Sequence, residues 1–261
     1  MIDEPLVPLP AQGRVFRRGR RVRLADADPS GRLRLDSCAR YLQDLGNDDT
    51  ADSGIDDDAI TWVVRRAVID VMTPPRWGEW VDMATWCGGL GSRWAERRMS
   101  IVGDRGGHIE ITTLWVQVDV ATMTPIRLSP RFVDTYGDAA GGRKVSSRLW
   151  LGDPPVGAAA QPWPLRAVDI DLIGHVNNAA YWAAVEEQVE PGTAFAHALI
   201  GRPHRAVMEY GPGIDAGAEV ELLVDEADDH LSVWFTVDDA VQAAATVIPL
   251  PEAAAPPAES G

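Results

Sequence analysis

Cysteine is scarce in this chain. Only Cys38 and Cys87 occur among 261 residues, and they form no C-x-x-C pair. Two thiols without framework spacing exclude a disulfide-stapled scaffold and indicate a reducing compartment, where both are expected to pack in the core. The sequence also lacks a run of eighteen apolar residues, which excludes a transmembrane helix. We therefore expect a cytoplasmic protein.

Basic residues are also fewer than acidic ones. The chain has 24 Lys and Arg against 39 Asp and Glu, which gives a formal net charge of −15. This balance argues against a general binder of nucleic acid or of anionic membranes. The sequence has no His/Cys cluster with ligand spacing, so we expect no metal and no cofactor.

Apolar residues, in contrast, are plentiful enough for a large core, at 46% of the chain with ten tryptophans. The first half predicts a strand at Val22–Ala25, a helix with Asp36 as N-cap, and an acidic turn-like segment at Asn47–Asp58. Four strand patterns follow, separated by Pro and Gly breakers: Thr61–Val71, Trp80–Trp86, Ala95–Val102 and Ile109–Val118. Such short connections favour antiparallel pairing.

A change of composition at Gly137 to Gly157 divides the chain, because this segment is small, polar and rich in Pro and Gly. We predict an N-terminal domain over 1–140, a linker over 141–163, a C-terminal domain over 164–250 and a disordered tail over 251–261. The C-terminal domain predicts a strand at Leu165–Val168, a polar turn and a helix. Four further strands are predicted at Ala206–Tyr210, Glu219–Val224, Leu231–Val237 and Ala243–Ile248.

The two halves are related by an internal repeat. The pattern D-x-D-x-x-G that begins at Asp26 recurs at Asp169, 143 residues later at all three positions. Each copy follows a predicted strand and precedes one helix and a group of strands, which favours duplication of a half-chain over coincidence. We therefore predict an α+β fold of two units, each a long central helix wrapped by a curved antiparallel sheet, with the two sheets side by side.

Polar side chains of the second unit gather in one turn before its helix. Asp171, His175 and two asparagines, Asn177 and Asn178, lie where an apolar helical stripe begins. Either asparagine can cap the helix, which Pro191-Gly192 is expected to end. A helix start offers unpaired N–H groups and a positive dipole end to a negative charge. This is a plausible catalytic arrangement, and it is also what an ordinary capped helix looks like.

Further motifs stand in a fixed order along the chain. They are Trp62-Val63-Val64-x-Arg66, Pro75-x-Trp77-Gly78-x-x-Val81, Thr85-Trp86, Trp115-Val116, Asp171-x-x-x-His175-Val176-Asn177-Asn178-x-x-Tyr181 and Glu209-Tyr210. In this order they resemble the acyl-ACP thioesterase family, in its double hotdog form, over most of the chain. The resemblance implies a hydrolase of fatty acid biosynthesis that converts fatty acyl-ACP to free fatty acid and thiol.

The resemblance also maps the family's catalytic Asp and His onto Asp171 and His175. Two positions depart from it, since Ile173 stands where plant enzymes have Asn, and Gly213 where they have Glu. The full polar network of the family is therefore not present. Its mechanism cannot be carried over whole.

The remaining chemistry follows from the residues. Asp171 would act as general base on water, or attack the thioester directly to give an anhydride. The amides of Gly174, His175 or Val176 would bind the developing oxyanion. The His175 ring would orient the water or protonate the departing thiolate, while Asn177 would brace the turn.

Several alternatives stay open. Asp28 resembles the turn of single-hotdog CoA thioesterases, although Arg32 and Arg34 stand where the second copy has His and Asn. Gln43 in the first helix could reach a site shared by both units, or it could face solvent. A hotdog enoyl-thioester hydratase is disfavoured, because it would require an Asn between an Asp and a His five residues apart. A degenerate hotdog that only binds acyl thioesters is the non-enzyme reading.

The partner predicted by the resemblance is an acyl thioester of acyl carrier protein, which is itself acidic. A chain of net charge −15 would need a local basic patch to dock it. The candidates are Arg17, Arg18, Arg20, Arg21 and Arg23, with Arg97 and Arg98 as further ones. Acyl-CoA remains the alternative carrier, and a homodimer is left open.

Overall fold

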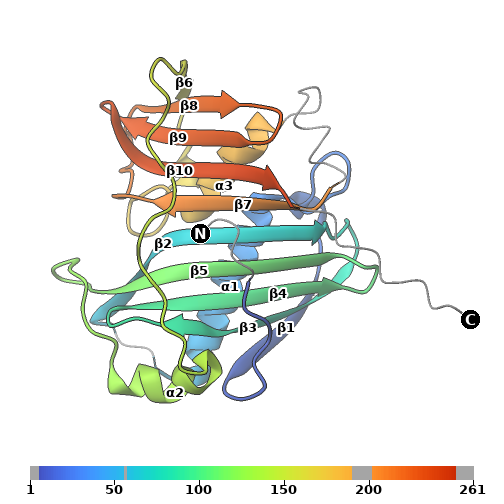
Figure 1. The fold of residues 1–261 in the computed structure, drawn as a ribbon, viewed down its shortest axis with the longest axis vertical. Coiled ribbons are helices and arrows are strands. Elements are labelled where there is room, and N and C mark those ends of the chain that lie inside the picture. Colours follow the sequence, from blue (N-terminus) through green and yellow to red (C-terminus); the bar gives the residue numbers. More distant parts are fainter. Residues whose placement is uncertain (1–5, 56–57, 190–201, 251–261) are drawn as a thin grey trace, which may run out of the picture.

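The fold is built on one ten-stranded sheet. The structure, a computed structural model, describes residues 6–55, 58–189 and 202–250. All neighbouring strands are antiparallel, in the order β1-β3-β4-β5-β2-β7-β10-β9-β8-β6 (Figure 1). The strands of the first half are β1 (Val15–Arg21), β2 (Ile60–Thr73), β3 (Trp80–Leu90), β4 (Trp94–Gly103) and β5 (His108–Asp119). Those of the second half are β6 (Ala160–Trp163), β7 (His204–Tyr210), β8 (Val220–Glu226), β9 (Leu231–Val237) and β10 (Ala240–Pro249).

The strand order is symmetric about the centre of the sheet. Read outwards from the centre, β2, β5, β4, β3 and β1 of the first unit correspond to β7, β10, β9, β8 and β6 of the second. The two units meet where β2 pairs with β7, from Arg66 opposite Glu209 to Val71 opposite His204. The predicted side-by-side arrangement of two α+β units is therefore confirmed.

Two helices cover one face of the sheet. They are α1 (Leu35–Ser53) and α3 (Asn178–Gln188), which pack against each other and behind the strands in Figure 1. The main core lies between these helices and the sheet and includes residues of both units, among them Leu42, Ile69, Trp182 and Phe235. A third helix, α2 (Pro130–Ala140), packs against β3 and forms a second, smaller core with it. It begins with Ser129 as N-cap, whose side chain accepts the Phe132 amide, followed by Pro130. This helix was not predicted from the sequence.

Several predicted boundaries are wrong for local electrostatic reasons. The strands expected at Val22–Ala25 and Leu165–Val168 are instead 3-10 turns, because carboxylates of Asp26 and Asp169 accept the N–H groups of Arg23 and Arg166 at 2.8 Å. These hydrogen bonds close a turn at the same place in both units. The strands lie a few residues earlier, at β1 and β6, so part of the expected linker is a strand that pairs with β8.

The first helix also differs from its predicted limits. It begins at Leu35 with Arg34 as N-cap, and Asp36 instead forms ion pairs with Arg34 and Arg40, both at 2.8 Å. The helix continues to Ser53, because the acidic side chains expected in a turn find basic partners. Asp49 is buried and bonds Arg97 at 2.7 Å. Both the tail expected over 251–261 and the helix stop at Pro191-Gly192 lie outside the described residues.

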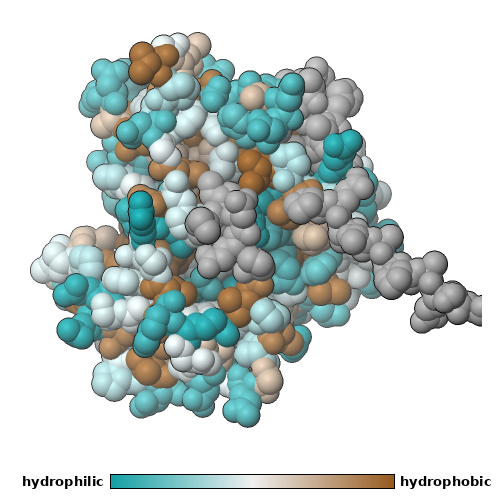
Figure 2. Space-filling view, in the orientation of Figure 1, coloured by the Kyte–Doolittle hydropathy of each residue, from teal (hydrophilic) through white to brown (hydrophobic). Residues whose placement is uncertain are grey.

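The connection between α2 and β6 crosses the outer face of the sheet (Figure 1). Its backbone is held at the seam by buried Glu209, whose carboxylate accepts the N–H groups of Trp150 and Leu151 at 2.7 to 2.9 Å. Arg66 lies 3.8 Å from the same carboxylate and stacks 3.6 Å from the Trp150 ring. Hydrophobic residues form scattered spots on this side of the molecule (Figure 2).

Substitution Glu209→Gln is expected to lower the free energy of unfolding by about 2 kcal/mol, because a buried charge-assisted acceptor of backbone N–H groups is lost. Urea denaturation followed by tryptophan fluorescence measures the change. The control is Glu221→Gln, which changes an exposed side chain of β8 and is expected to change stability by less than about 0.5 kcal/mol. Equal losses in both variants would contradict the role assigned to Glu209.

Candidate active site at the seam of the two units

The turn before α3 is organised by Asp171. Its Oδ1 accepts hydrogen bonds from the amides of Ile173 (3.0 Å) and His175 (3.3 Å). Its Oδ2 makes no hydrogen bond within the described part of the chain. Burial, with a contribution from the Asp171 charge, raises the pKa of the Tyr181 hydroxyl to about 12. Asp171 is thus a half-buried carboxylate with one oxygen fixed and one oxygen available.

The amides predicted to bind the oxyanion are already in use. Gly174 donates to the Asp171 carbonyl at 3.1 Å, His175 to the Asp171 carboxylate, and Val176 to the Ile214 carbonyl at 2.8 Å. The prediction that these amides are available to an oxyanion is therefore wrong, because all three donate hydrogen bonds within the turn or to the segment after β7. Over the described residues, the first amide of the helix without an acceptor is that of Asn178.

Of the two asparagines predicted as possible caps, Asn177 is the N-cap of α3. Its Oδ1 accepts the amide of Ala179 at 2.9 Å and also the Gln43 Nε2 group of α1 at 3.2 Å. The second contact joins the helix of the first unit to the helix start of the second. Of the two alternatives for Gln43, the structure therefore places it at the seam rather than in solvent.

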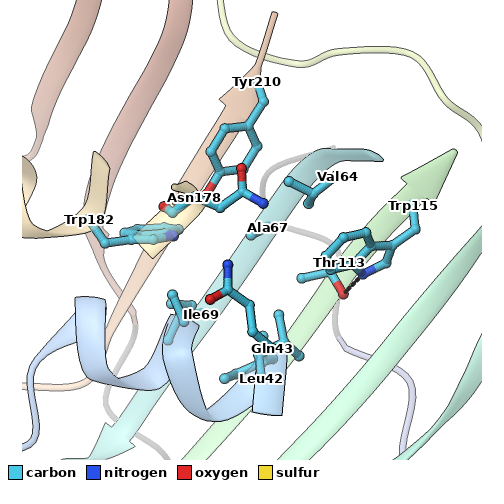
Figure 3. A pocket seen from close by; sticks show the side chains of 12 residues that line it. Leu42, Gln43, Val64, Ala67, Ile69, Thr113, Trp115, Asn178, Trp182 and Tyr210 are labelled. Atoms are coloured by element: carbon cyan, nitrogen blue, oxygen red, sulfur yellow. Dashed lines mark hydrogen bonds between the residues drawn. The ribbon is translucent and has the colours of Figure 1, made fainter. Parts of the chain in front are cut away.

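A narrow apolar pocket opens beside this contact. Gln43 and Asn178 point into the same space, below Tyr210 (Figure 3). The cavity measures about 20 Å³, which is room for about one water molecule. Trp182 contributes a buried indole N–H group, and burial raises the pKa of the neighbouring Tyr210 hydroxyl. The lining is Ala39, Leu42, Gln43, Val64, Ala67, Ile69, Ile111, Thr113, Trp115, Asn178, Trp182 and Tyr210.

The predicted site residues thus fall into two groups. Asp171, Gly174, His175 and Val176 form the turn and do not line the pocket. The pocket begins one residue beyond Asn177, which connects the two groups through Gln43. Sequence reasoning did not identify Asp215, whose Oδ1 lies 3.1 Å from Nε2 of His175. No local motif marks it, since the contact depends on a loop forty residues further along the chain.

The equivalent turn of the first unit is closed. Both oxygens of Asp28 are occupied, Oδ1 by Ser30 and the Arg32 amide and Oδ2 by the Arg32 guanidinium at 3.0 Å. Burial raises the pKa of Asp28, but these hydrogen bonds outweigh it and hold that pKa below its usual value. The Arg32 side chain, 7% exposed, also binds Glu186 of α3 with two hydrogen bonds of 3.2 and 2.6 Å.

Glu186 completes the closure. Its Oε1 accepts the amide of Leu35, the first residue of α1, at 2.6 Å. Leu35 is 143 residues before Asn178, and Gln43 is 143 residues before Glu186. At these equivalent positions, the carboxylate of Glu186 accepts the Leu35 amide in the first unit. In the second unit the neutral Gln43 lies beside the Asn178 amide, which has no acceptor among the described residues. This contrast singles out the second-unit turn as the open one.

Both cysteines are remote from this chemistry. Cys38 is 0% exposed and Cys87 is 5% exposed, and burial raises the pKa of both thiols, that of Cys87 to about 11. We expect neither thiol of the native protein to react with a chromogenic disulfide reagent over an hour at pH 8, and both to react in denaturant. Rapid reaction of the native protein would contradict the packing.

A large antiparallel sheet around two paired helices, with a pocket at their seam, defines a double hotdog protein. Over its described residues the chain has no helix long and apolar enough to cross a membrane and no group of three His, Cys, Asp or Glu residues arranged to hold a metal. Family models match the acyl-ACP thioesterase N-terminal domain over residues 13–136 and its C-terminal domain over residues 156–245. The chain belongs to the acyl-ACP thioesterase family.

Similar proteins agree with this assignment. An uncharacterized protein of Mycobacterium tuberculosis is 35% identical over 94% of this chain and 96% of that protein. A solved oleoyl thioesterase from Lactobacillus plantarum has a TM-score of 0.72 at 23% identity, covering 94% of this chain and 100% of that one. The 12:0-ACP thioesterase from Umbellularia californica has a TM-score of 0.74 at 19% identity, covering 92% and 98%. At these identities the two structures show the shared fold.

Proposed function

We propose that this thioesterase hydrolyses fatty acyl thioesters, carried by acyl carrier protein or by CoA, at the turn before α3. The observation that carries the proposal is the contrast between the two units. Among the residues that the structure describes, one carboxylate oxygen and the first helix amide of the second unit have no partner, whereas both equivalents are occupied in the first unit.

The chemistry assigns a task to each group. The Asn178 amide, at the positive end of α3, would hold the thioester carbonyl oxygen as negative charge develops, with the Gln43 side chain beside it. Asp171 Oδ2 would take a proton from the attacking water, or attack the carbonyl carbon itself. The carbon–sulfur bond then breaks, and the thiolate takes a proton to leave as thiol.

The apolar pocket would receive the acyl chain. Its lining from α1, β2 and β5 is almost wholly apolar, which suits an alkyl chain. Because the cavity is only about 20 Å³, side chains such as Leu42 and Trp115 must move to admit more than about one methylene group. Chain length would then depend on how far this wall can open.

The carrier can be tested against the surface charges. Arg97 and Arg98 are unsuitable for docking, since Arg97 binds Asp49 at 2.7 Å and Arg98 is 1% exposed. Among the candidates on the edge strand β1, Arg17, Arg18 and Arg21 are exposed. Arg18 lies 3.8 Å from Asp48, which leaves Arg17 and Arg21 as the exposed ones without a carboxylate partner among the described residues. These two would favour an acidic carrier protein over CoA, provided that they overcome the net charge of −15.

A panel of acyl-ACP and acyl-CoA substrates over chain length, with thiol release as the readout, tests the proposal. We expect hydrolysis of at least one chain-length class, faster on one carrier than on the other. Tight binding of acyl thioesters without thiol release would support the non-catalytic reading instead. Size-exclusion chromatography of the same preparation tests whether the chain forms a homodimer.

A further inference from the structure

His175 has a carboxylate partner that the family pattern does not supply. Its Nε2 lies 3.1 Å from Oδ1 of Asp215. The two residues are also paired through their backbones, because Val176 donates to Ile214 and Ala216 donates to Gly174 on either side of them. Asp215 is therefore kept in a fixed register with His175, even though its side chain is 84% exposed.

The first unit has the same backbone bridge without the carboxylate contact. Arg32 and Arg76 face each other there, flanked by the equivalent hydrogen bonds from Leu33 to Pro75 and from Trp77 to Gly31. Two cations cannot pair, and each turns to an oxygen elsewhere: Arg32 to Asp28 and Glu186, and Arg76 to the Ser30 carbonyl. Of the two bridges, the one in the unit with the open turn is therefore the one that sets a carboxylate against a side-chain N–H group.

Gly213 packs directly against the other ring nitrogen of His175. A Cβ atom at this position would lie 2.9 Å from Nδ1, too close for the ring to keep its place. This is the position where the resemblance expected a glutamate. With glycine there the ring keeps its place beside Asp215, and the His175 side chain as a whole is 38% exposed to solvent.

We propose that Asp215 is a positioning residue that replaces the missing glutamate two residues away. Its carboxylate accepts the Nε2–H of His175, which fixes the neutral tautomer with the lone pair on Nδ1. Nδ1 then accepts a hydrogen bond from the attacking water in the space beside Gly213, while Asp171 takes the proton. The inference rests on the proposed thioester hydrolysis at this turn.

The first test compares Asp215→Ala and Asp215→Glu with the wild type. We expect Ala to lower kcat about 10-fold with KM unchanged, and Glu to restore most of it. Added acetate should also restore part of the activity of the Ala variant, because the position is open to solvent, whereas chloride at equal ionic strength should not. The matched control is Asp229→Ala, which removes an equally exposed carboxylate 2.8 Å from His230 and should leave kcat unchanged.

The second test is Gly213→Ala, which places a methyl group against Nδ1. We expect kcat to fall about 10-fold with normal thermal stability, because only the His175 ring is displaced. Gly152→Ala, where an added Cβ meets nothing within 4 Å, is the control. If the wild type is active and neither Asp215→Ala nor Gly213→Ala loses activity, the inference fails while the hydrolase stands. If the wild type releases no thiol from any substrate, the proposed function itself fails.

Discussion

Substitution Asp171→Asn is expected to lower kcat about 1000-fold while the protein stays folded. The amide keeps an oxygen that can accept the N–H groups of Ile173 and His175, so the turn is retained. It cannot take a proton from water or attack a carbonyl, and general-base groups typically contribute about 100- to 10,000-fold. Thiol release from the best substrate of the panel, measured at saturating concentration, gives the ratio.

The chain provides its own control for this experiment. Asp28→Asn changes the equivalent carboxylate in the closed unit, where both oxygens are bonded to Ser30 and Arg32. It should leave kcat within about 2-fold and instead lower stability by about 1 to 2 kcal/mol, because a half-buried, ion-paired acceptor is weakened. The reverse outcome, with Asp28 essential and Asp171 dispensable, would move the active site to the first unit.

Local patterns were sufficient to predict most of the sheet. Strands β2 to β5 and β7 to β10 coincide with alternating apolar stretches between Pro and Gly breakers, and each such signal lies within about ten residues. The duplicated D-x-D-x-x-G pattern predicted that the second half repeats the first. That an asparagine at this point caps α3 could also be predicted from the sequence, because a cap accepts an amide only two residues further along the chain.

What the sequence could not predict depends on contacts between distant segments. The Val176 amide donates to Ile214, and the Leu35 amide of the first unit donates to Glu186 of α3. The latter contact spans 151 residues. Asp215 reaches His175 only because the segment after β7 returns beside the turn. Candidate residues could therefore be named from sequence, but which amides and oxygens remain free required the fold.

Substitution Gln43→Glu should close the open site in the way that Glu186 closes the other. In the wild type the Gln43 Nε2 group donates to Asn177, a contact that a carboxylate cannot make. The new carboxylate would be repelled by the Asn177 oxygen and would bind the free Asn178 amide, as Glu186 binds Leu35 at 2.6 Å. Because it then competes with the thioester oxygen, kcat/KM should fall about 100-fold, comparable to the loss of one oxyanion donor.

Glu186→Gln separates this effect from a change of charge at the helix seam. It alters the equivalent position of the closed unit, so kcat/KM should stay within about 2-fold of the wild type, measured at a temperature where the protein is folded. Stability should fall by about 2 to 3 kcal/mol, because buried Arg32 loses its bidentate partner. If Gln43→Glu keeps full activity, Asn178 is not the amide that holds the carbonyl oxygen. Ordinary helix capping would then be enough to explain why the Asn178 amide has no acceptor. The contrast between the two units would no longer indicate catalysis.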